Sequence, residues 1–279
     1  MELSKPLARK LLIPRNPNSR KGQNGRILFI GGSKDYYGSP ALAASAALRS
    51  GADLAYLLVP SKIAPVIAGY SPDFIVSEYE GNYLTKMAFP QLSELQHKAD
   101  VLVIGNGLTK KPLVLQTIHQ IVSFWQKPIV IDADAIMPGL KHPAMGAVYT
   151  PHVVEFERIS GSPPANGIEA RKKQVSMLAK KLRATVLLKG RIDIASDGRI
   201  TYETSTGNAG MTAGGTGDTL AGTCAALLAQ KHEPVVAASI AAYLNGAAGD
   251  LAYKKYGNGM IASDIISELP AALKLLQKK

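Results

Sequence analysis

The chain has one cysteine, few aromatic residues and no long apolar run. Because Cys224 is alone, a disulfide framework and a four-thiolate metal site are both excluded. The longest apolar stretch, VVAASIAAYL from Val235 to Leu244, is about half as long as a membrane span. The basic N-terminal segment lacks the apolar core and the cleavage site of a secretory signal. We therefore expect a cytoplasmic protein with no membrane association.

Acidic residues are also in short supply. The 32 Lys and Arg outnumber the 21 Asp and Glu and give a formal net charge of +11. Such an excess favours anionic partners, which include nucleic acid and phosphorylated small molecules, but an ordinary solvated surface also explains it. Nucleic-acid-binding proteins usually interleave basic and aromatic residues on one face, whereas here the aromatic content is only 6% and the basic residues are scattered. We therefore predict no nucleic-acid partner.

Apolar runs of strand length alternate with helical patterns along most of the chain. The first strand candidate is RILFIGG at 26–32, and a helical pattern at 39–51 follows it. Further strand candidates occur at 53–60, 73–79, 99–107, 127–135, 146–152 and 184–190, and further helical patterns at 113–125 and 169–182. Continuous Val, Ile and Leu runs indicate strands covered on both faces. The pattern predicts an α/β three-layer sandwich with a mostly parallel central sheet.

The last third of the chain differs in pattern. RIDIASDGRITYETST at 191–206 has an Asp-Gly flanked by alternating residues, which predicts a β-hairpin. From Thr219 the pattern is helical almost to the end, with one more helix around 263–275. No repeat, low-complexity tract or linker divides the chain. We therefore predict a single domain over residues 1–279, with residues 1–22 as an N-terminal extension.

Polar and glycine-rich stretches follow five of the predicted strands, at the sheet edge where open α/β sheets bind ligands. They are IGGSKDYYGS, IGNGLTKKP, DADA, TPHVVE and KGRID. None is a G-x-G-x-x-G or G-x-x-x-x-G-K-[ST] motif, so the dinucleotide fingerprint and the P-loop have little support. Each stretch also has an ordinary structural explanation. Asp132 and Asp134 could cap a helix, and His152 and Lys189 could be plain loop and strand-end residues.

The stretch AGGTGDTLAG is more specific. Glycines 214, 215 and 217 allow successive backbone N–H groups to converge, and the helix expected near Thr219 adds its positive end, which together predict a phosphate-binding anion hole. Asp218 could be the N-cap of that helix. A carboxylate beside a phosphate is unfavourable, however, unless it accepts a proton from a hydroxyl that attacks the phosphate. The stretch therefore favours phosphoryl transfer with Asp218 as the base.

Five motifs together resemble those of a known family. GGTGD at the start of a late helix, with IGGSKDYYGSPALAASAALRSGA, DADAI, TPHVVE and LLKG upstream, resembles the ADP/ATP-dependent NAD(P)H-hydrate dehydratases of the ribokinase-like superfamily. The resemblance covers about residues 22–273 and implies a ribokinase-like fold. It also implies nicotinamide cofactor repair. The C6 hydroxyl of the S-epimer of hydrated NADH or NADPH is phosphorylated from ADP or ATP with Mg²⁺, and elimination of phosphate then regenerates the reduced cofactor.

The resemblance also implies roles for individual residues. Asp218 corresponds to the base, and Gly215, Thr216 and Gly217 to the anion hole. Ser39, Gly107, His152 and Asp218 would contact the hydrate. The nucleotide would be bound by Lys189, Gly190, Arg191, Ile192, Asp193 and Gly217. Asp132 and Glu155 are candidates for holding Mg²⁺ through water, since this cation prefers carboxylate ligands.

The sequence departs from the family pattern at two places. Val153-Val154 stands where Pro-Gly is usual, which implies a stiffer loop after His152, and Asp193 stands where a threonine is usual. Many relatives also have an N-terminal epimerase domain, for which the segment before the first predicted strand is too short. We therefore expect a separate epimerase in the same pathway. The resemblance further implies a homo-oligomer, either a dimer or a tetramer.

Two alternatives remain open from the sequence. A small-molecule kinase of the hydroxyethylthiazole or pyridoxal kinase type would share the fold and stop after phosphoryl transfer. A basic nucleic-acid-binding protein would instead show steeply salt-dependent affinity and would not need Asp218.

Overall fold

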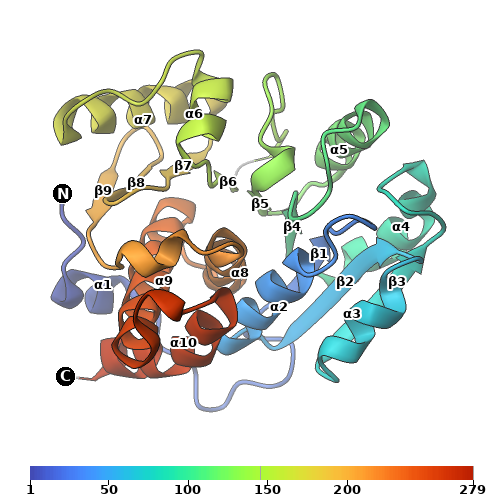
Figure 1. The fold of residues 1–279 in the computed structure, drawn as a ribbon, viewed down its shortest axis with the longest axis horizontal. Coiled ribbons are helices and arrows are strands. Elements are labelled where there is room, and N and C mark those ends of the chain that lie inside the picture. The colour runs from blue at the N-terminus through green and yellow to red at the C-terminus, as the bar shows by residue number, and fades with distance from the viewer. Residues whose placement is uncertain (145, 279) are drawn as a thin grey trace.

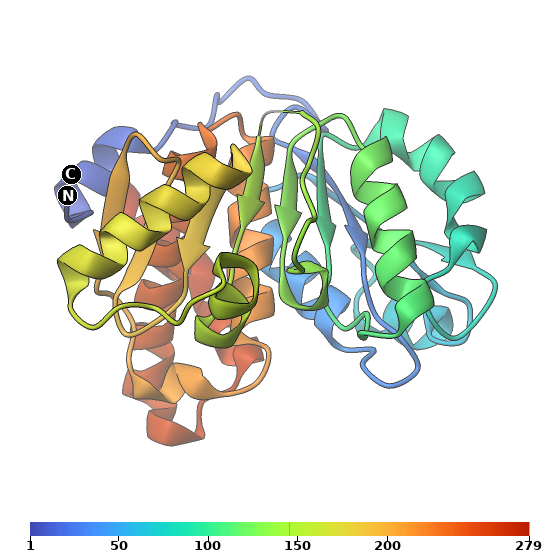
Figure 2. The same ribbon diagram turned by 90° about the horizontal axis from the view of Figure 1, so that it is seen from above.

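The computed structural model describes residues 1–144 and 146–278. Within these ranges nine strands form one sheet in the order β3-β2-β1-β4-β5-β6-β7-β8-β9 (Figures 1 and 2). The strands are β1 (Arg26–Ile30), β2 (Leu54–Pro60), β3 (Phe74–Tyr79), β4 (Val101–Ile104), β5 (Ile129–Ile131), β6 (Ala147–Tyr149), β7 (Thr185–Leu188), β8 (Asp193–Ser196) and β9 (Thr201–Thr204). Each pairing of neighbouring strands from β3 to β7 is parallel, and the β7–β8 and β8–β9 pairings are antiparallel. The predicted mostly parallel sheet and terminal hairpin are confirmed.

Helices cover both faces of this sheet. They are α1 (Lys5–Leu11), α2 (Ser39–Arg49), α3 (Ala64–Tyr70), α4 (Phe89–Lys98), α5 (Pro112–Phe124), α6 (Val153–Ser160), α7 (Ile168–Leu182), α8 (Thr216–Ala229), α9 (Pro234–Tyr256) and α10 (Ala262–Gln277). Helices α4 to α7 lie on one face, whereas α2, α3, α8, α9 and α10 lie on the other (Figure 2). A hydrophobic core lies on each face of the sheet, and neighbouring residues of a strand point into different cores. In β4, for example, Val103 belongs to one core and Ile104 to the other. This explains why β4 is apolar at every position.

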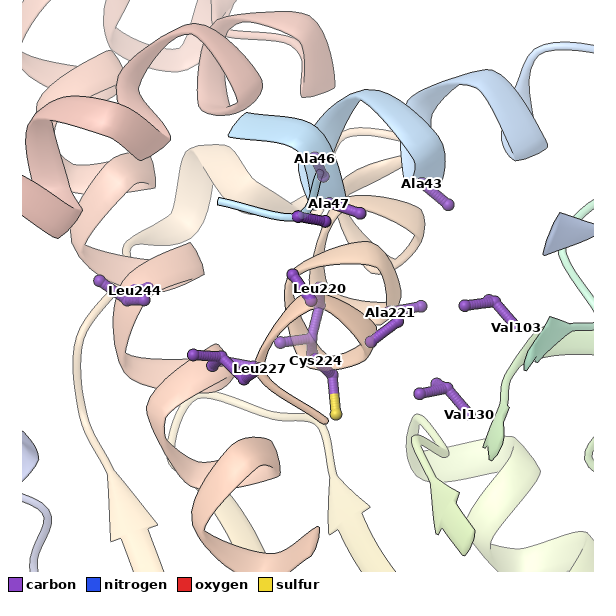
Figure 3. Close-up of a cluster of buried hydrophobic side chains, with 14 of the residues drawn as sticks. Ala43, Ala46, Ala47, Val103, Val130, Leu220, Ala221, Cys224, Leu227 and Leu244 are labelled. Atoms are coloured by element: carbon purple, nitrogen blue, oxygen red, sulfur yellow. The ribbon is translucent and has the colours of Figure 1, made fainter. Parts of the chain in front are cut away.

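Small residues allow α2 and α8 to pack closely together (Figure 3). Ala43, Ala46 and Ala47 of α2 are completely buried against α8. A Cβ atom at Gly222 would lie 2.0 Å from the carbonyl oxygen of Ala43, so only glycine fits at this position. Cys224 is also fully buried in this cluster. The packing fixes where α8 begins, and the start of α8 carries Asp218.

Two helix starts differ from the sequence-based expectation. Helix α8 begins at Thr216 rather than near Thr219, because Gly215 adopts the left-handed conformation (φ 90°) and serves as its N-cap residue. Asp218 therefore lies in the first turn of α8, and its interpretation as an N-cap is wrong. Val153 and Val154 open α6 directly after His152, so they form a helical turn and not a stiffened loop.

Helix α9 is much longer than its most apolar stretch suggested. The segment Pro234–Gly259 is long and apolar enough to cross a membrane by those two criteria alone. However, 72% of its apolar window is buried inside the protein, against α8, α10 and the sheet. We therefore interpret α9 as a core helix.

The strand order changes direction between β1 and β4, which are neighbours in the sheet. The chain runs outward from β1 through β2 to β3, returns to β4 beside β1, and then continues to β9. At such a switch point the loops after the two central strands diverge and leave a crevice. Here these loops are residues 31–38 and 105–111. Gly105 (φ 128°) is required in the second loop, because a Cβ atom would lie 1.7 Å from the carbonyl oxygen of Asp132.

Candidate active site

Asp218 projects from the first turn of α8 toward the switch point between β1 and β4. Its Oδ1 accepts a hydrogen bond of 2.6 Å from Nδ2 of Asn106, the second residue after β4. Burial and the nearby carboxylate of Asp132 raise the pKa of Asp218 to about 7, although Asn106 and Ser39 act in the opposite direction as donors. A carboxyl group with this pKa suits proton exchange near neutral pH.

Asn106 links Asp218 to a second buried carboxylate. The same Nδ2 atom donates to Oδ2 of Asp132 at 3.0 Å, and the Asn106 side chain is almost completely buried. Oδ1 of Asp132 accepts from Thr150 Oγ1 at 2.7 Å and from Lys189 Nζ at 2.9 Å. The network thus runs from α8 through β4 and β5 to β7, and one amide group separates two carboxylates that would otherwise repel each other.

Backbone N–H groups converge at the start of α8. Among the described residues, the N–H groups of Gly214, Gly215, Thr216, Gly217 and Asp218 find no acceptor, and the first helical bond runs from Thr219 N to Gly215 O. The ammonium of Lys189 lies close by, since a Cβ atom on Gly217 would be 3.4 Å from its Nζ. Asp132 and Glu155 raise the pKa of Lys189 despite its burial, so this side chain is a cation. The geometry fits the anion hole predicted from the glycines.

His152 caps α6. Its Nδ1 accepts from the N–H groups of Val154 (3.1 Å) and Glu155 (3.3 Å), while Glu155 Oε2 accepts from the N–H of His152 (2.9 Å). These bonds place the ring proton on Nε2, which lies 3.2 Å from Glu155 Oε1. Burial and the nearby Lys189 also lower the pKa of His152, which keeps the ring neutral.

A cavity of about 490 Å³ opens beside Lys189, between the β7–β8 turn, the segment 206–212 and helices α8 and α9. Of the predicted nucleotide-binding residues, Lys189, Gly190, Arg191, Asp193 and Gly217 line it, whereas Ile192 does not. His152, expected at the hydrate, lines this cavity too. Ser39 and Gly107 lie elsewhere, beneath Tyr36 at the switch point. Asp218 stands between these two regions.

Comparison with known proteins identifies this arrangement. The sequence profile of NAD(P)H-hydrate dehydratase matches residues 27–271. The chain belongs to the NAD(P)H-hydrate dehydratase family. It is 38% identical over 275 residues to the ADP-dependent (S)-NAD(P)H-hydrate dehydratase of Cenarchaeum symbiosum, a match that covers 95% of this chain and 94% of that one.

Other similarities agree with this family assignment. The chain is 40% identical over 274 residues to the bifunctional NAD(P)H-hydrate repair enzyme of Methanothermobacter thermautotrophicus; the match covers 94% of this chain and 52% of that protein. The chain thus spans about half the length of several curated relatives. The Bacillus subtilis ADP/ATP-dependent NAD(P)H-hydrate dehydratase, co-crystallized with ATP and Mg²⁺, superimposes with a TM-score of 0.85 at 26% identity, covering 99% of this chain and 98% of that one. The ribokinase-like fold is confirmed.

The residues predicted to hold Mg²⁺ do not form a direct metal site. Both oxygens of the buried Asp132 already accept hydrogen bonds, and Lys189 Nζ lies 2.9 Å from Asp132 and 3.9 Å from Glu155. An ammonium group thus occupies the space that a cation shared by the two carboxylates would need. No group of three or more His, Cys, Asp or Glu side chains suited to a metal occurs in the part of the chain that the structure describes. Both carboxylates thus lie beside Lys189, and their contact with Mg²⁺ through water stays a prediction.

Asp193, which stands where the family usually has a threonine, forms a hydrogen bond within the β7–β8 turn. Its Oδ1 accepts from the N–H of Gly190 at 2.9 Å, which turns the carboxyl group toward its own loop. Burial raises its pKa to about 6. The structure therefore shows how an acidic residue is accommodated on the wall of this cavity.

Asn106 is the site residue that the sequence analysis missed. The stretch IGNGLTKKP was recognised, but only its glycine at 107 was assigned a role. An asparagine between two glycines at a strand end usually indicates a turn. Its contacts with Asp132 and Asp218 appear only when β4, β5 and α8 are assembled.

Proposed function

We propose that this chain is a nucleotide-dependent NAD(P)H-hydrate dehydratase that returns the S-epimer of hydrated NADH or NADPH to the reduced cofactor. The observation that carries this proposal is the placement of Asp218, whose pKa is raised to about 7, at the start of α8, where the N–H groups of 214–218 find no acceptor within residues 1–144 and 146–278. The names of the relatives that the chain matches nearly end to end supply the substrate and the nucleotide.

The site supports a two-stage reaction. Asp218 takes the proton from the C6 hydroxyl as its oxygen attacks the terminal phosphorus of the nucleotide, and the bond between that phosphorus and the departing nucleotide breaks. The N–H groups of 214–218 and the ammonium of Lys189 stabilise the negative charge on the transferring phosphoryl group. Phosphate then leaves C6 with its bonding electrons, pushed by the lone pair of ring N1, and loss of the C5 proton restores the double bond.

Several finer features belong to the same proposal. ADP or ATP is the donor. Asp132 and Glu155 would hold Mg²⁺ through water, and the cation would supply further positive charge for the phosphoryl transfer. A separate epimerase would convert the other hydrate epimer, and the chain would act as a homo-oligomer in the cytoplasm. The predicted roles of Ser39, Gly107 and His152 at the hydrate remain proposals of the same kind.

The proposal is tested by incubating the purified protein with hydrated NADH and Mg²⁺, with ADP or ATP in separate reactions. We expect the absorbance of the reduced nicotinamide to recover, with one inorganic phosphate released per cofactor. Asp218→Asn should lower the rate by at least about a thousandfold, because it removes the base. Asp264→Asn is the matched control, since Asp264 occupies the same position in the first turn of α10 and its carboxylate accepts from the N–H of Ile261.

Two outcomes would contradict the proposal. If ATP is consumed and a phosphorylated alcohol accumulates without recovery of the cofactor, the chain is a small-molecule kinase. If Asp218→Asn and Asp264→Asn retain equal activity, Asp218 is not the base. The donor that supports recovery at lower concentration is the preferred one.

A further inference from the structure

Three lysines lie on the two loops that follow β1 and β4 at the switch point. Lys34 belongs to the loop after β1, and Lys110 and Lys111 end the loop after β4. All three side chains are exposed. The loop that carries Lys110 and Lys111 begins with Asn106, which binds Asp218 directly. Lys110 and Lys111 are therefore carried by the same loop as a residue that contacts the proposed base.

Lys34 and Lys111 are held over one aromatic ring. Their Nζ atoms lie 5.8 and 4.7 Å from the ring centroid of Tyr83. Neither lysine forms an ion pair within residues 1–144 and 146–278. Two like charges near the same ring repel each other, and an anion between them would remove that repulsion. Lys110 differs, because its Nζ is 3.8 Å from Asp134 Oδ1.

The backbone beneath these lysines is fixed by specific contacts. Tyr83 Oη donates to Asp35 Oδ2 at 2.8 Å, and the N–H of Lys34 donates to Asn82 O at 3.0 Å. Thr109, a β-branched residue with φ 87°, donates its N–H to Asp134 Oδ2 at 2.9 Å. Such a conformation costs about 1 to 3 kcal/mol and persists at sites where the position of a loop matters. The Oγ1 atom of Thr109 is buried and has no hydrogen-bond partner among the described residues.

We propose that Lys34 and Lys111 bind the pyrophosphate of the hydrated dinucleotide. This inference rests on the proposed function, which requires the hydroxyl of the nicotinamide ring to reach Asp218. The pyrophosphate is separated from that ring by one ribose. Asn106 and Lys111 are five residues apart, at most about 18 Å of extended chain, so both lie within the reach of one dinucleotide. The phosphates of the donor are served separately by Lys189 and the start of α8.

Aromatic side chains beside the lysines suit the rest of such a ligand. Tyr36 and Tyr37, in the same loop as Lys34, are 62% and 46% exposed. Exposed aromatic side chains of this kind can stack with the bases of a dinucleotide. Cationic side chains next to exposed aromatic residues match a ligand in which a pyrophosphate lies between two nucleosides.

The test compares Lys34→Gln/Lys111→Gln with a control that loses the same charge, Lys173→Gln/Lys254→Gln, whose lysines are exposed on α7 and α9. Binding of intact NADH and NADPH is measured by their fluorescence, and the KM values for hydrate and donor are measured in the repair assay. For the first variant we expect at least tenfold weaker binding of both cofactors and a similar rise in the hydrate KM. The donor KM should stay within about twofold, and the control should behave as wild type.

Each contrary result has a defined meaning. Equal binding by the two double variants would overturn the proposal, and so would an equal loss of affinity for the donor. Weaker binding of NADPH alone would move these lysines to the 2′-phosphate and would also overturn the pyrophosphate assignment. If the wild type binds NADH but never repairs hydrate, the proposed function fails while the binding comparison still decides the role of the lysines.

Discussion

At the scale of single residues, Asp218 connects the chemistry of the site to pH. Its pKa in the folded protein is about 7, above the usual 3.8, because the group is buried near Asp132. Only the ionised form can accept a proton. We therefore expect kcat/KM to rise between about pH 6 and 8 and then level off, as measured by a pH profile of the repair reaction. A rate that falls across this range would contradict the assignment of Asp218 as base.

Stability depends on the same group with a definite sign. Because the folded-state pKa is raised, the carboxyl ionises first in the unfolded chain, so it destabilises the fold progressively from about pH 4 to 7 and fully above pH 7. Asp218→Asn should therefore be more stable than wild type at pH 8 by roughly 1 to 3 kcal/mol and equal to it near pH 4. Chemical denaturation at both pH values measures the difference.

Asn106 should control the position of this pH profile. Asn106→Ala removes the donor to Asp218 Oδ1 and the amide that separates it from Asp132, so the pKa of Asp218 should rise further. We expect the rising limb of the profile to move up by about one pH unit, with activity partly recovered at pH 9. Asn245→Ala is the control for the position of the limb. Asn245 is also buried, contacts Thr216 and Thr219 of α8 and lines the Lys189 cavity, but it contacts neither carboxylate, so its removal should change the activity without moving the limb. A loss of activity without movement of the limb would make Asn106 merely structural.

Asp218 and Asn106 differ in how far the sequence alone predicts them. The position of Asp218 at the start of a helix, behind a glycine-rich turn, could be predicted from the sequence, and its role as the base stays a prediction. Asn106 could not be predicted, because its partners come from β5 and α8, which are 26 and 112 residues away. His152 shows a third case, in which the motif was recognised but the helix-capping role of its ring was not.

At the scale of elements, the site depends on how closely α8 approaches α2. Gly222→Ala would place a methyl group 2.0 Å from the carbonyl oxygen of Ala43, so the helices must separate. We expect a loss of about 2 to 3 kcal/mol in the free energy of unfolding, and a lower kcat in the molecules that remain folded, because the start of α8 moves with the helix. Denaturation curves and assays well below the melting temperature measure the two effects.

Gly69→Ala provides the matched control. Gly69 lies within α3, and no atom would lie within 4 Å of an added Cβ. Its replacement should leave activity unchanged and stabilise the helix by roughly 0.5 to 1 kcal/mol. If Gly222→Ala behaves in the same way, the close helix contact does not position the active site.

The elements themselves were largely predictable, since buried strands of this sheet are continuous apolar runs with few exceptions. The residues at which the helices begin were less predictable. The start of α8 depends on the left-handed Gly215, which packs against α2 and α10, and the start of α6 depends on a capping box between His152 and Glu155. Both are tertiary or side-chain effects that periodicity does not contain.

At the scale of the whole molecule, the sheet order separates the two anionic ligands that the proposed reaction needs. The β1–β4 switch point carries Asn106 and the Lys34 loop, and the β7–β8 hairpin carries the Lys189 cavity. Helix α8 begins between them. In the proposed reaction, one mostly parallel sheet would thus bring a hydroxyl and a phosphoryl group together at Asp218, and the excess of positive charge would suit both ligands.

The first residues of the chain close the far edge of this same sheet. The N–H of Leu3 donates to Glu203 O at 2.8 Å, and the N–H of Glu203 donates to Met1 O at 3.0 Å, so the segment adds a short parallel pairing to β9. The Leu3 side chain is almost fully buried. An edge strand left open is a template for aggregation, and this segment covers it.

Leu3→Ala should cost about 2 to 3 kcal/mol through lost packing, and Leu3→Pro should cost more, because proline also removes the N–H that pairs with β9. Both variants should retain kcat/KM well below their melting temperatures, since Asp218 and Asn106 do not contact this edge. Light scattering on heating should show earlier aggregation for Leu3→Pro than for Leu3→Ala. Equal behaviour of the two variants would mean that the side chain alone, and not the pairing of the backbone, protects the edge of the sheet.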